Sequence, residues 1–231
     1  MHLTYADFPY LSAILFSCVA GLGVILAVPD ERKDLIRKAG AVFSGATLFL
    51  SVSLFVSYDR HLGGLQFVEK IAWIPSLGIH YFNGVDGFSL PNLLLTGIVF
   101  FTGVLTMWGM ESRVKEFYAL YFVLVTGVFG LFMSMDLFFI FVWYDVSLFP
   151  MYLLIAVWGS TRKEYGAMKL TLYLLAGSAL ILPTVIFLFV RSGLNTFDVV
   201  SLMQSGVLTP QDQKFAFLLL YLGFGILAGV W

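Results

Sequence analysis

Long apolar stretches separated by shorter polar segments dominate the pattern along the chain. At ~1.5 Å per residue, each stretch is long enough for a helix to cross most or all of a ~30 Å hydrocarbon core. The pattern therefore predicts an all-α membrane protein with about seven transmembrane helices. We place the helices at Tyr10–Val28, Ala39–Tyr58, Pro91–Met110, Phe117–Met133, Leu137–Trp158, Leu170–Val190 and Phe215–Trp231.

The distribution of cations predicts how these helices are oriented. Of the 13 Lys and Arg residues, nine lie in the short loops after the first, third and fifth spans. The other four lie in the long loops 59–90 and 191–214. Because cytoplasmic loops carry the excess of Lys and Arg, we expect the short loops to be cytoplasmic and the N-terminus to be outside.

The long loop between the second and third spans contains a short apolar run, Ile79–Phe82, followed by Asn83-Gly84. This pattern predicts a strand entering a tight turn, and hence a β-hairpin on the outer membrane surface. His61 and His80 also lie in this loop. They lack metal-ligand spacing with Cys or a third His, so we expect solvated loop histidines and no metal site.

Composition narrows the functional class. The chain is 60% hydrophobic and 12% charged, about half the charge of a soluble domain, with a net charge of −1. This charge balance does not predict a basic surface that would bind nucleic acid. Its single cysteine, Cys18, excludes an internal disulfide and an iron–sulfur cluster, and we expect it to be a small core residue. No GxGxxG dinucleotide motif follows a strand.

The fifth predicted span contains one charge, Asp145, and one proline, Pro150. A carboxylate in lipid is costly and normally faces a protein interior or a wet cavity. Pro150 cannot donate to the carbonyl of Val146, so we expect the helix to kink there. Tyr144 and Ser147 add hydroxyls to this polar locus. The alternative is a structural Asp that stabilises helix packing through a hydrogen bond to a neighbouring helix. We favour a functional role, because ionisable residues inside membranes usually have one.

Two features predict how neighbouring spans pack. Only Ser134, Met135 and Asp136 join the fourth and fifth spans, which favours an antiparallel pair with Asp136 as the N-cap of the fifth. In the sixth span, Gly177 and Ser178 are small enough to permit close helix approach. We interpret Gly177 and Ser178 as helix-packing residues rather than as part of a site.

Specific motifs then point to a family. One stretch is WIPSLGIHYFNGVDGFSL, in the predicted hairpin. The block 137–182 places an acid five residues before Pro-Met, and follows it with Trp-Gly, a basic loop, Ala-x-Lys, Leu-Tyr and Gly-Ser. Together they resemble the M-type (mitochondrial subunit 4 type) membrane chain of respiratory complex I, NADH-quinone oxidoreductase. The resemblance spans all 231 residues, roughly the N-terminal half of a typical member.

The resemblance implies a fold and a function. Residues 1–116 would form a three-helix region with the outer hairpin. Residues 117–231 would begin an antiporter-like bundle with inverted repeats, which we expect to be cut within its seventh helix because the sequence is a fragment or one half of a split protein. The family couples electron transfer from NADH to quinone with proton translocation, through buried ionisable residues at mid-membrane.

Some of the family's functional residues are matched in this chain and one is not. Asp145 falls where the family usually has glutamate in its fifth helix, and Lys169 falls on a family lysine at the cytoplasmic start of helix six. The family lysine of helix seven usually pairs with the helix-five acid, but its position corresponds to Leu227 here. The departure removes a neighbouring cation that would keep the carboxylate ionised.

The resemblance also implies an assembly. The partners would be the other membrane subunits of complex I, of types L, N, K, J and H, in the inner membrane of a bacterial cell. NADH, FMN, iron–sulfur clusters and quinone would bind other parts of the complex, and this chain would have no redox centre of its own.

Other functions remain open at this point. The chain could belong to a related cation/proton antiporter or membrane-bound hydrogenase, which gene context would reveal. It could also be a non-transporting spacer, which the missing helix-seven lysine favours. A channel or ligand-gated receptor is disfavoured because the sequence contains no recognisable selectivity filter or ligand-binding pattern.

Overall fold

The structure is a computed structural model that describes residues 3–5 and 8–230. Within these residues it is mainly helical, with one two-stranded sheet. The elements in chain order are α1 (Tyr10–Ala27), α2 (Lys33–Ser57), β1 (Gln66–Ile74), β2 (Ile79–Val85), α3 (Ser89–Thr106), α4 (Val114–Met133), α5 (Leu137–Trp158), α6 (Lys163–Ser192), α7 (Val199–Ser205) and α8 (Pro210–Leu227).

Six helices of the described chain, α1 to α6, are long and apolar enough to cross a membrane. The sequence predicts seven, and the seventh, Phe215–Trp231, coincides with α8 only as far as Leu227; its last residue, Trp231, lies outside the described residues. This helix begins earlier than predicted, at Pro210, because Thr209 and Asp212 form a capping box at its start. The polar residues of its first turns lower its mean hydropathy. The predicted multi-pass membrane architecture is therefore confirmed, with α8 as the exception among the predicted spans.

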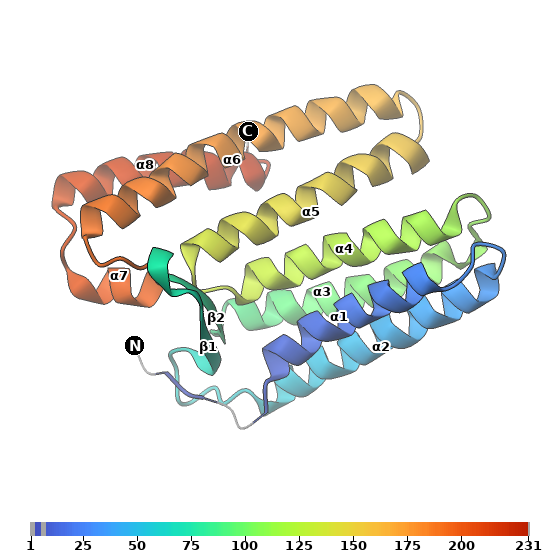
Figure 1. Ribbon diagram of the computed structural model, residues 1–231, viewed down its shortest axis with the longest axis horizontal. Coiled ribbons are helices and arrows are strands. Elements are labelled where there is room, and N and C mark those ends of the chain that lie inside the picture. The colour runs from blue at the N-terminus through green and yellow to red at the C-terminus, as the bar shows by residue number, and fades with distance from the viewer. Residues whose placement is uncertain (1–2, 6–7, 231) are drawn as a thin grey trace.

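The long helices run up and down beside one another (Figure 1). The hairpin and α7 lie at one end of the bundle, together with the starts of α1, α5 and α8 (Figure 1). The α1–α2, α3–α4 and α5–α6 connections lie at the opposite end. The cation-rich short loops thus share one end, as the topology requires. Which end is cytoplasmic stays a prediction.

The predicted β-hairpin is present, but its turn lies elsewhere. β1 and β2 pair in antiparallel fashion, and Asn83-Gly84 lies inside β2. The chain instead reverses through Pro75–Leu77 to Gly78, which adopts the left-handed conformation with φ of 65°. Gly84 is needed for packing, since a Cβ there would lie 2.5 Å from the Leu65 side chain. The expected turn at Asn83-Gly84 is therefore wrong.

Two cores meet at α5. One is built from α1 to α4, where Cys18 is fully buried as expected. The other joins the hairpin to α5, α6 and α8, and Trp143 of α5 packs against both cores. Two glycines of α4 permit its close approach to α5. A Cβ on Gly130 would lie 2.3 Å from the Trp143 ring, and one on Gly127 would lie 2.9 Å from the Ser147 Cβ. The division of the chain at residue 116 stays a prediction.

The start of α5 is fixed as the sequence predicts. Asp136 is its N-cap and accepts hydrogen bonds from the backbone N–H groups of Phe138 and Phe139. The helix then runs through Pro150 without interruption to Trp158. Pro150 lacks an N–H to donate, so the helix is continuous but misses a backbone bond there, and the kink at Pro150 stays a prediction.

Candidate functional site

Asp145 lies eight residues after the start of α5, roughly 12 Å along the helix. The residue is half-buried, and its Oδ1 accepts a hydrogen bond of 2.9 Å from the Ser178 hydroxyl of α6. Within the described ranges, no other hydrogen bond or ion pair to this carboxylate is found. The acid therefore has one neutral donor and no cation beside it.

A cavity of about 330 Å³ lies against Asp145. Its other lining residues are Leu148, Phe149, Tyr152, Thr171 and Leu175. Those on α5 follow Asp145 and those on α6 precede Ser178, so the cavity extends toward the end of the bundle that carries the α5–α6 loop. The carboxylate is thus, with the Tyr152 and Thr171 side chains, one of the polar groups in a lining that is otherwise apolar.

The other residues of the predicted polar locus lie near Asp145 in sequence but do not bond it. The Ser147 hydroxyl donates to the backbone carbonyl of Tyr144 at 2.7 Å. The Tyr144 hydroxyl and the Trp143 indole N–H are buried without a hydrogen-bond partner among the described residues. These two groups are the polar side-chain atoms of α5 that remain unsatisfied around the acid.

Lys169 does not approach Asp145. It is exposed in the second turn of α6, nine residues before Ser178, which is roughly 13 Å along the helix. It does not line the cavity. This position agrees with the prediction of a lysine near the end of the span.

The neighbouring residues Gly177 and Ser178 have different roles. A Cβ on Gly177 would lie 2.8 Å from the Leu227 side chain and 3.0 Å from the Gly223 carbonyl oxygen of α8. Gly177 is therefore a packing residue, as predicted. Ser178 instead contacts the acid directly, which the interpretation as packing alone missed. No signal in the sequence could reveal this contact, because it depends on the register between α5 and α6. At the position where the family lysine was expected, Leu227 contributes only an apolar contact.

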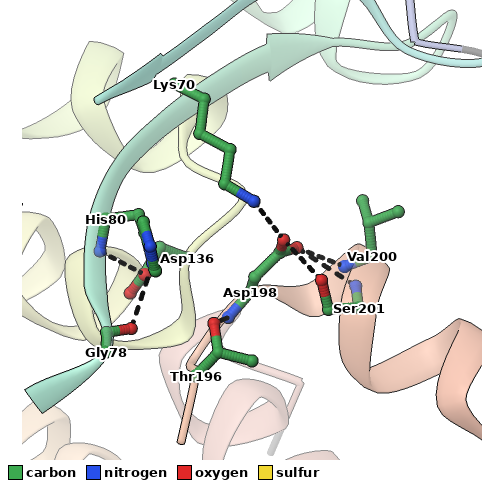
Figure 2. Close-up of polar contacts among 8 residues, drawn as sticks. All are labelled: Lys70, Gly78, His80, Asp136, Thr196, Asp198, Val200 and Ser201. Carbon is green, nitrogen blue, oxygen red and sulfur yellow. Dashed lines mark hydrogen bonds and ion pairs between the residues drawn. The ribbon is translucent and has the colours of Figure 1, made fainter. Parts of the chain in front are cut away.

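A second polar cluster lies at the hairpin end (Figure 2). The ammonium group of Lys70 in β1 reaches the carboxylate of Asp198, the N-cap of α7, at 2.7 Å (Figure 2). Asp198 also accepts bonds from the backbone of Val200 and from the backbone and hydroxyl of Ser201. Burial alone would raise the pKa of Asp198, but the bonds from Lys70 and Ser201 hold it below its ordinary value.

Asp136 belongs to the same cluster. Besides capping α5, it accepts a hydrogen bond of 3.0 Å from the backbone N–H of His80 in β2 (Figure 2). Burial raises the pKa of Asp136, although these backbone N–H groups oppose the shift. His61 is exposed, as expected. His80 is only partly exposed, because it lies in β2 and its ring nitrogen Nδ1 is 3.1 Å from the Gly78 carbonyl oxygen, so it is less solvated than expected.

Sequence reasoning missed the cluster because its members come from three segments far apart in the chain. Only Asp136 and Asp198, each just before a helix, give a local signal as N-caps. Within the described residues, no group of three His, Cys, Asp or Glu could hold a metal ion.

Comparison with known proteins finds relatives by sequence and by fold. Residues 134–231 match the family described as NADH:quinone oxidoreductase/Mrp antiporter, TM. NAD(P)H-quinone oxidoreductase chain 4 from a Nostoc species is 33% identical over 225 residues, covering 97% of this chain and 41% of that protein. The chloroplastic chain 4 of Chlorokybus atmophyticus is 35% identical over 221 residues, covering 94% of this chain and 42% of the relative. The chain thus spans about two fifths of the length of these relatives.

Solved structures of membrane complexes contain chains with a similar fold. A chain of respiratory complex I from Thermus thermophilus with bound NADH superposes with a TM-score of 0.79 at 25% identity, covering 94% of this chain and 43% of that one. A chain of the Mrp complex from a Dietzia species superposes with a TM-score of 0.71 at 18% identity, covering 93% and 23% of the two chains, and indicates a shared fold alone.

Proposed function

We propose that this chain, which is similar over nearly its whole length to NAD(P)H-quinone oxidoreductase chain 4, is a proton-translocating membrane subunit of a NADH-quinone oxidoreductase, complex I. In this role it couples electron transfer from NADH to quinone with proton movement across the membrane. The observation that carries the proposal is Asp145, a half-buried acid within an apolar span that faces a cavity and has one neutral hydrogen-bond partner.

The chemical step is the binding and release of a proton by Asp145. Water in the adjoining cavity delivers the proton to the carboxylate, and the proton leaves when a cation approaches and stabilises the charged form. The resemblance places the family lysine at about Leu227, which carries no charge, so that cation comes from Lys169 after a rearrangement or from elsewhere in the assembly. The Val146 carbonyl, which Pro150 leaves without its helical donor, can hold a water molecule beside the acid.

The redox chemistry belongs to other subunits in this proposal. NADH, FMN, iron–sulfur clusters and quinone bind there, and this chain contributes the proton pathway. Its partners are the L-, N-, K-, J- and H-type membrane chains, in the inner membrane of a bacterial cell. The hairpin end faces outward and the loop carrying Arg162 and Lys163 faces the cytoplasm, in agreement with the positive-inside rule.

Substitution of Asp145 tests the proposal. In assembled complex reconstituted into sealed vesicles, Asp145→Asn should abolish most proton pumping driven by NADH, because an amide cannot bind and release the proton. Asp145→Glu, the family's usual acid, should retain pumping. Normal pumping by the Asn variant would show that Asp145 is a packing residue and would overturn the proposed function.

A second candidate is a subunit of a cation/proton antiporter or a membrane-bound hydrogenase, and the family description matched by residues 134–231, which includes Mrp antiporters, favours it. Vesicles distinguish the two. A complex I subunit translocates protons when NADH and quinone are supplied. An antiporter subunit instead exchanges protons against a sodium gradient without either electron carrier.

A further inference from the structure

The hydroxyl of Ser178 is used differently from its neighbours in the membrane spans. Thr171 and Thr184, on the same helix, each donate to the backbone carbonyl four residues before them. Ser147 of α5 donates to the carbonyl three residues before it. Such back-bonding is the usual way to satisfy a hydroxyl within a helix. Ser178 instead donates across the helix interface to Asp145.

The position of this hydroxyl is fixed by the packing around it. Ser178 is only 6% exposed. On the adjacent residue, Gly177, α6 meets α8 so closely that a Cβ would lie 3.0 Å from the Gly223 carbonyl oxygen. The reciprocal Cβ on Gly223 would lie 3.2 Å from the carbonyl oxygen of Gly177. This glycine contact holds α6 from one side while Ser178 reaches α5 on another.

The bond leaves the two oxygens of Asp145 in different situations. Oδ1 accepts from Ser178, and for Oδ2 no protein donor is found among the described residues. Asp145 is also part of the cavity wall. The carboxyl group is therefore held by the protein at one oxygen, and the other oxygen has no protein donor among the described residues.

From this arrangement we infer that Ser178 is a positioning residue for proton exchange at Asp145. Its hydroxyl holds Oδ1 against α6 and so directs Oδ2 toward the cavity. This inference rests on the proposed function of Asp145. It adds the requirement that α6 supply a hydroxyl donor to Asp145, since no Lys or Arg of the described chain bonds this carboxylate.

The experiment uses the assembled complex in sealed vesicles and combines two measurements. The first is the rate of NADH-driven proton pumping. The second is the infrared carbonyl band of protonated Asp145 in redox-difference spectra, identified by its loss in Asp145→Asn. We expect Ser178→Ala to slow pumping roughly tenfold, the effect of losing a hydrogen bond to a charged group. It should also move the band to higher wavenumber, because the carboxyl group loses its donor. Ser178→Thr, which keeps the hydroxyl, should retain both properties.

Matched controls separate positioning from packing. Ser147→Ala and Thr184→Val remove hydroxyls that bond only their own helices, so neither should move the Asp145 band. If Ser178→Ala lowers the yield of complex, Ser178→Cys carries the same test, since it preserves volume with a weaker donor.

The possible failures are distinguishable. An unchanged band and unchanged pumping in the Ser178 variants, together with lost pumping in Asp145→Asn, would overturn the positioning role and leave the proposed function intact. Normal pumping in Asp145→Asn would overturn the proposed function itself.

Discussion

The acids at the hairpin end are fully buried and the acid of α5 is half-buried, and they also differ in how many hydrogen bonds their oxygens accept. Asp198 accepts four hydrogen bonds, one of them from the Lys70 ammonium group, and Asp136 accepts three from backbone N–H groups. Asp145 accepts one, from a hydroxyl. Saturated carboxylates hold segments of the fold together. A carboxylate with one neutral donor and an adjoining cavity can change its charge without breaking the fold.

The strongest test of this contrast removes the carboxylate of Asp198. Asp198→Ala leaves the Lys70 ammonium group and the first N–H groups of α7 without their acceptor. We expect the free energy of unfolding to fall by about 3 kcal/mol, at the low end for a broken buried pair because Lys70 can still reach solvent. Thermal unfolding of the purified protein in detergent measures the change. The matched control is Glu116→Ala, which breaks an exposed ion pair with Arg113 and should cost about 0.5 kcal/mol or less.

Removal of Asp136 should have a smaller effect. Asp136→Ala deprives α5 of its N-cap and His80 of its backbone acceptor, and we expect a loss of about 2 kcal/mol in the same assay. Asp136→Asn keeps an acceptor oxygen and should lose about half as much. Equal losses in both variants would mean that charge, rather than capping, is what Asp136 contributes.

Acid titration provides a third test. The folded-state pKa of Asp198 is below its unfolded value, so the stability it contributes is fully present above about pH 4. That stability is lost as the pH falls through the folded-state pKa. The thermal midpoint should therefore fall less steeply below about pH 4 in Asp198→Asn than in the wild type. The raised pKa of Asp136 has the opposite sign and acts in a different window, above about pH 4 and up to its folded-state pKa, where the folded state binds the extra proton. In that window the wild type gains stability from Asp136 as the pH falls, so Asp136→Asn should lose stability more steeply there. Identical slopes in the three proteins would contradict the assignment.

The smallest stability effect should belong to Asp145. Asp145→Asn keeps an oxygen that can accept from Ser178, so we expect its free energy of unfolding to stay within about 0.5 kcal/mol of the wild type. A loss as large as that of Asp198→Ala would place Asp145 among the residues that hold the fold. Measured beside pumping, this variant separates function from stability at a single position.

Features that depend on neighbouring residues in the chain could be predicted from the sequence, whereas features that depend on distant residues could not. Apolar runs long enough to span a membrane, the acid at Asp145 and the cap at Asp136 are all visible within one helix length. The turn of the hairpin was misplaced because Asn83-Gly84 has turn-like composition, whereas its role depends on the distant Leu65. The start of α8 was misplaced for a different reason, since a capping box extends a helix into polar residues that hydropathy leaves out.

The candidate site was predictable only in part. Asp145 is visible from its type and place, but its partner Ser178 depends on how α5 and α6 are aligned, and a run of small residues indicates packing equally well. The bond between Lys70 and Asp198 joins residues 128 positions apart, and no spacing rule connects them.

The attachment of α5 at its first residues also limits how this helix can move. The backbone around Asp136 is bonded on both sides, from Met135 N–H to the Phe82 carbonyl at 2.8 Å and from Leu137 N–H to the Phe197 carbonyl at 3.0 Å. A piston-like slide of α5 along its axis would break both bonds. A swing of the half beyond Pro150 would break neither, because that half is distant from the anchor and begins where the backbone ladder already lacks a bond. Motion that changes the surroundings of Asp145 is therefore expected to be hinge-like and to come from the end of the bundle opposite the hairpin.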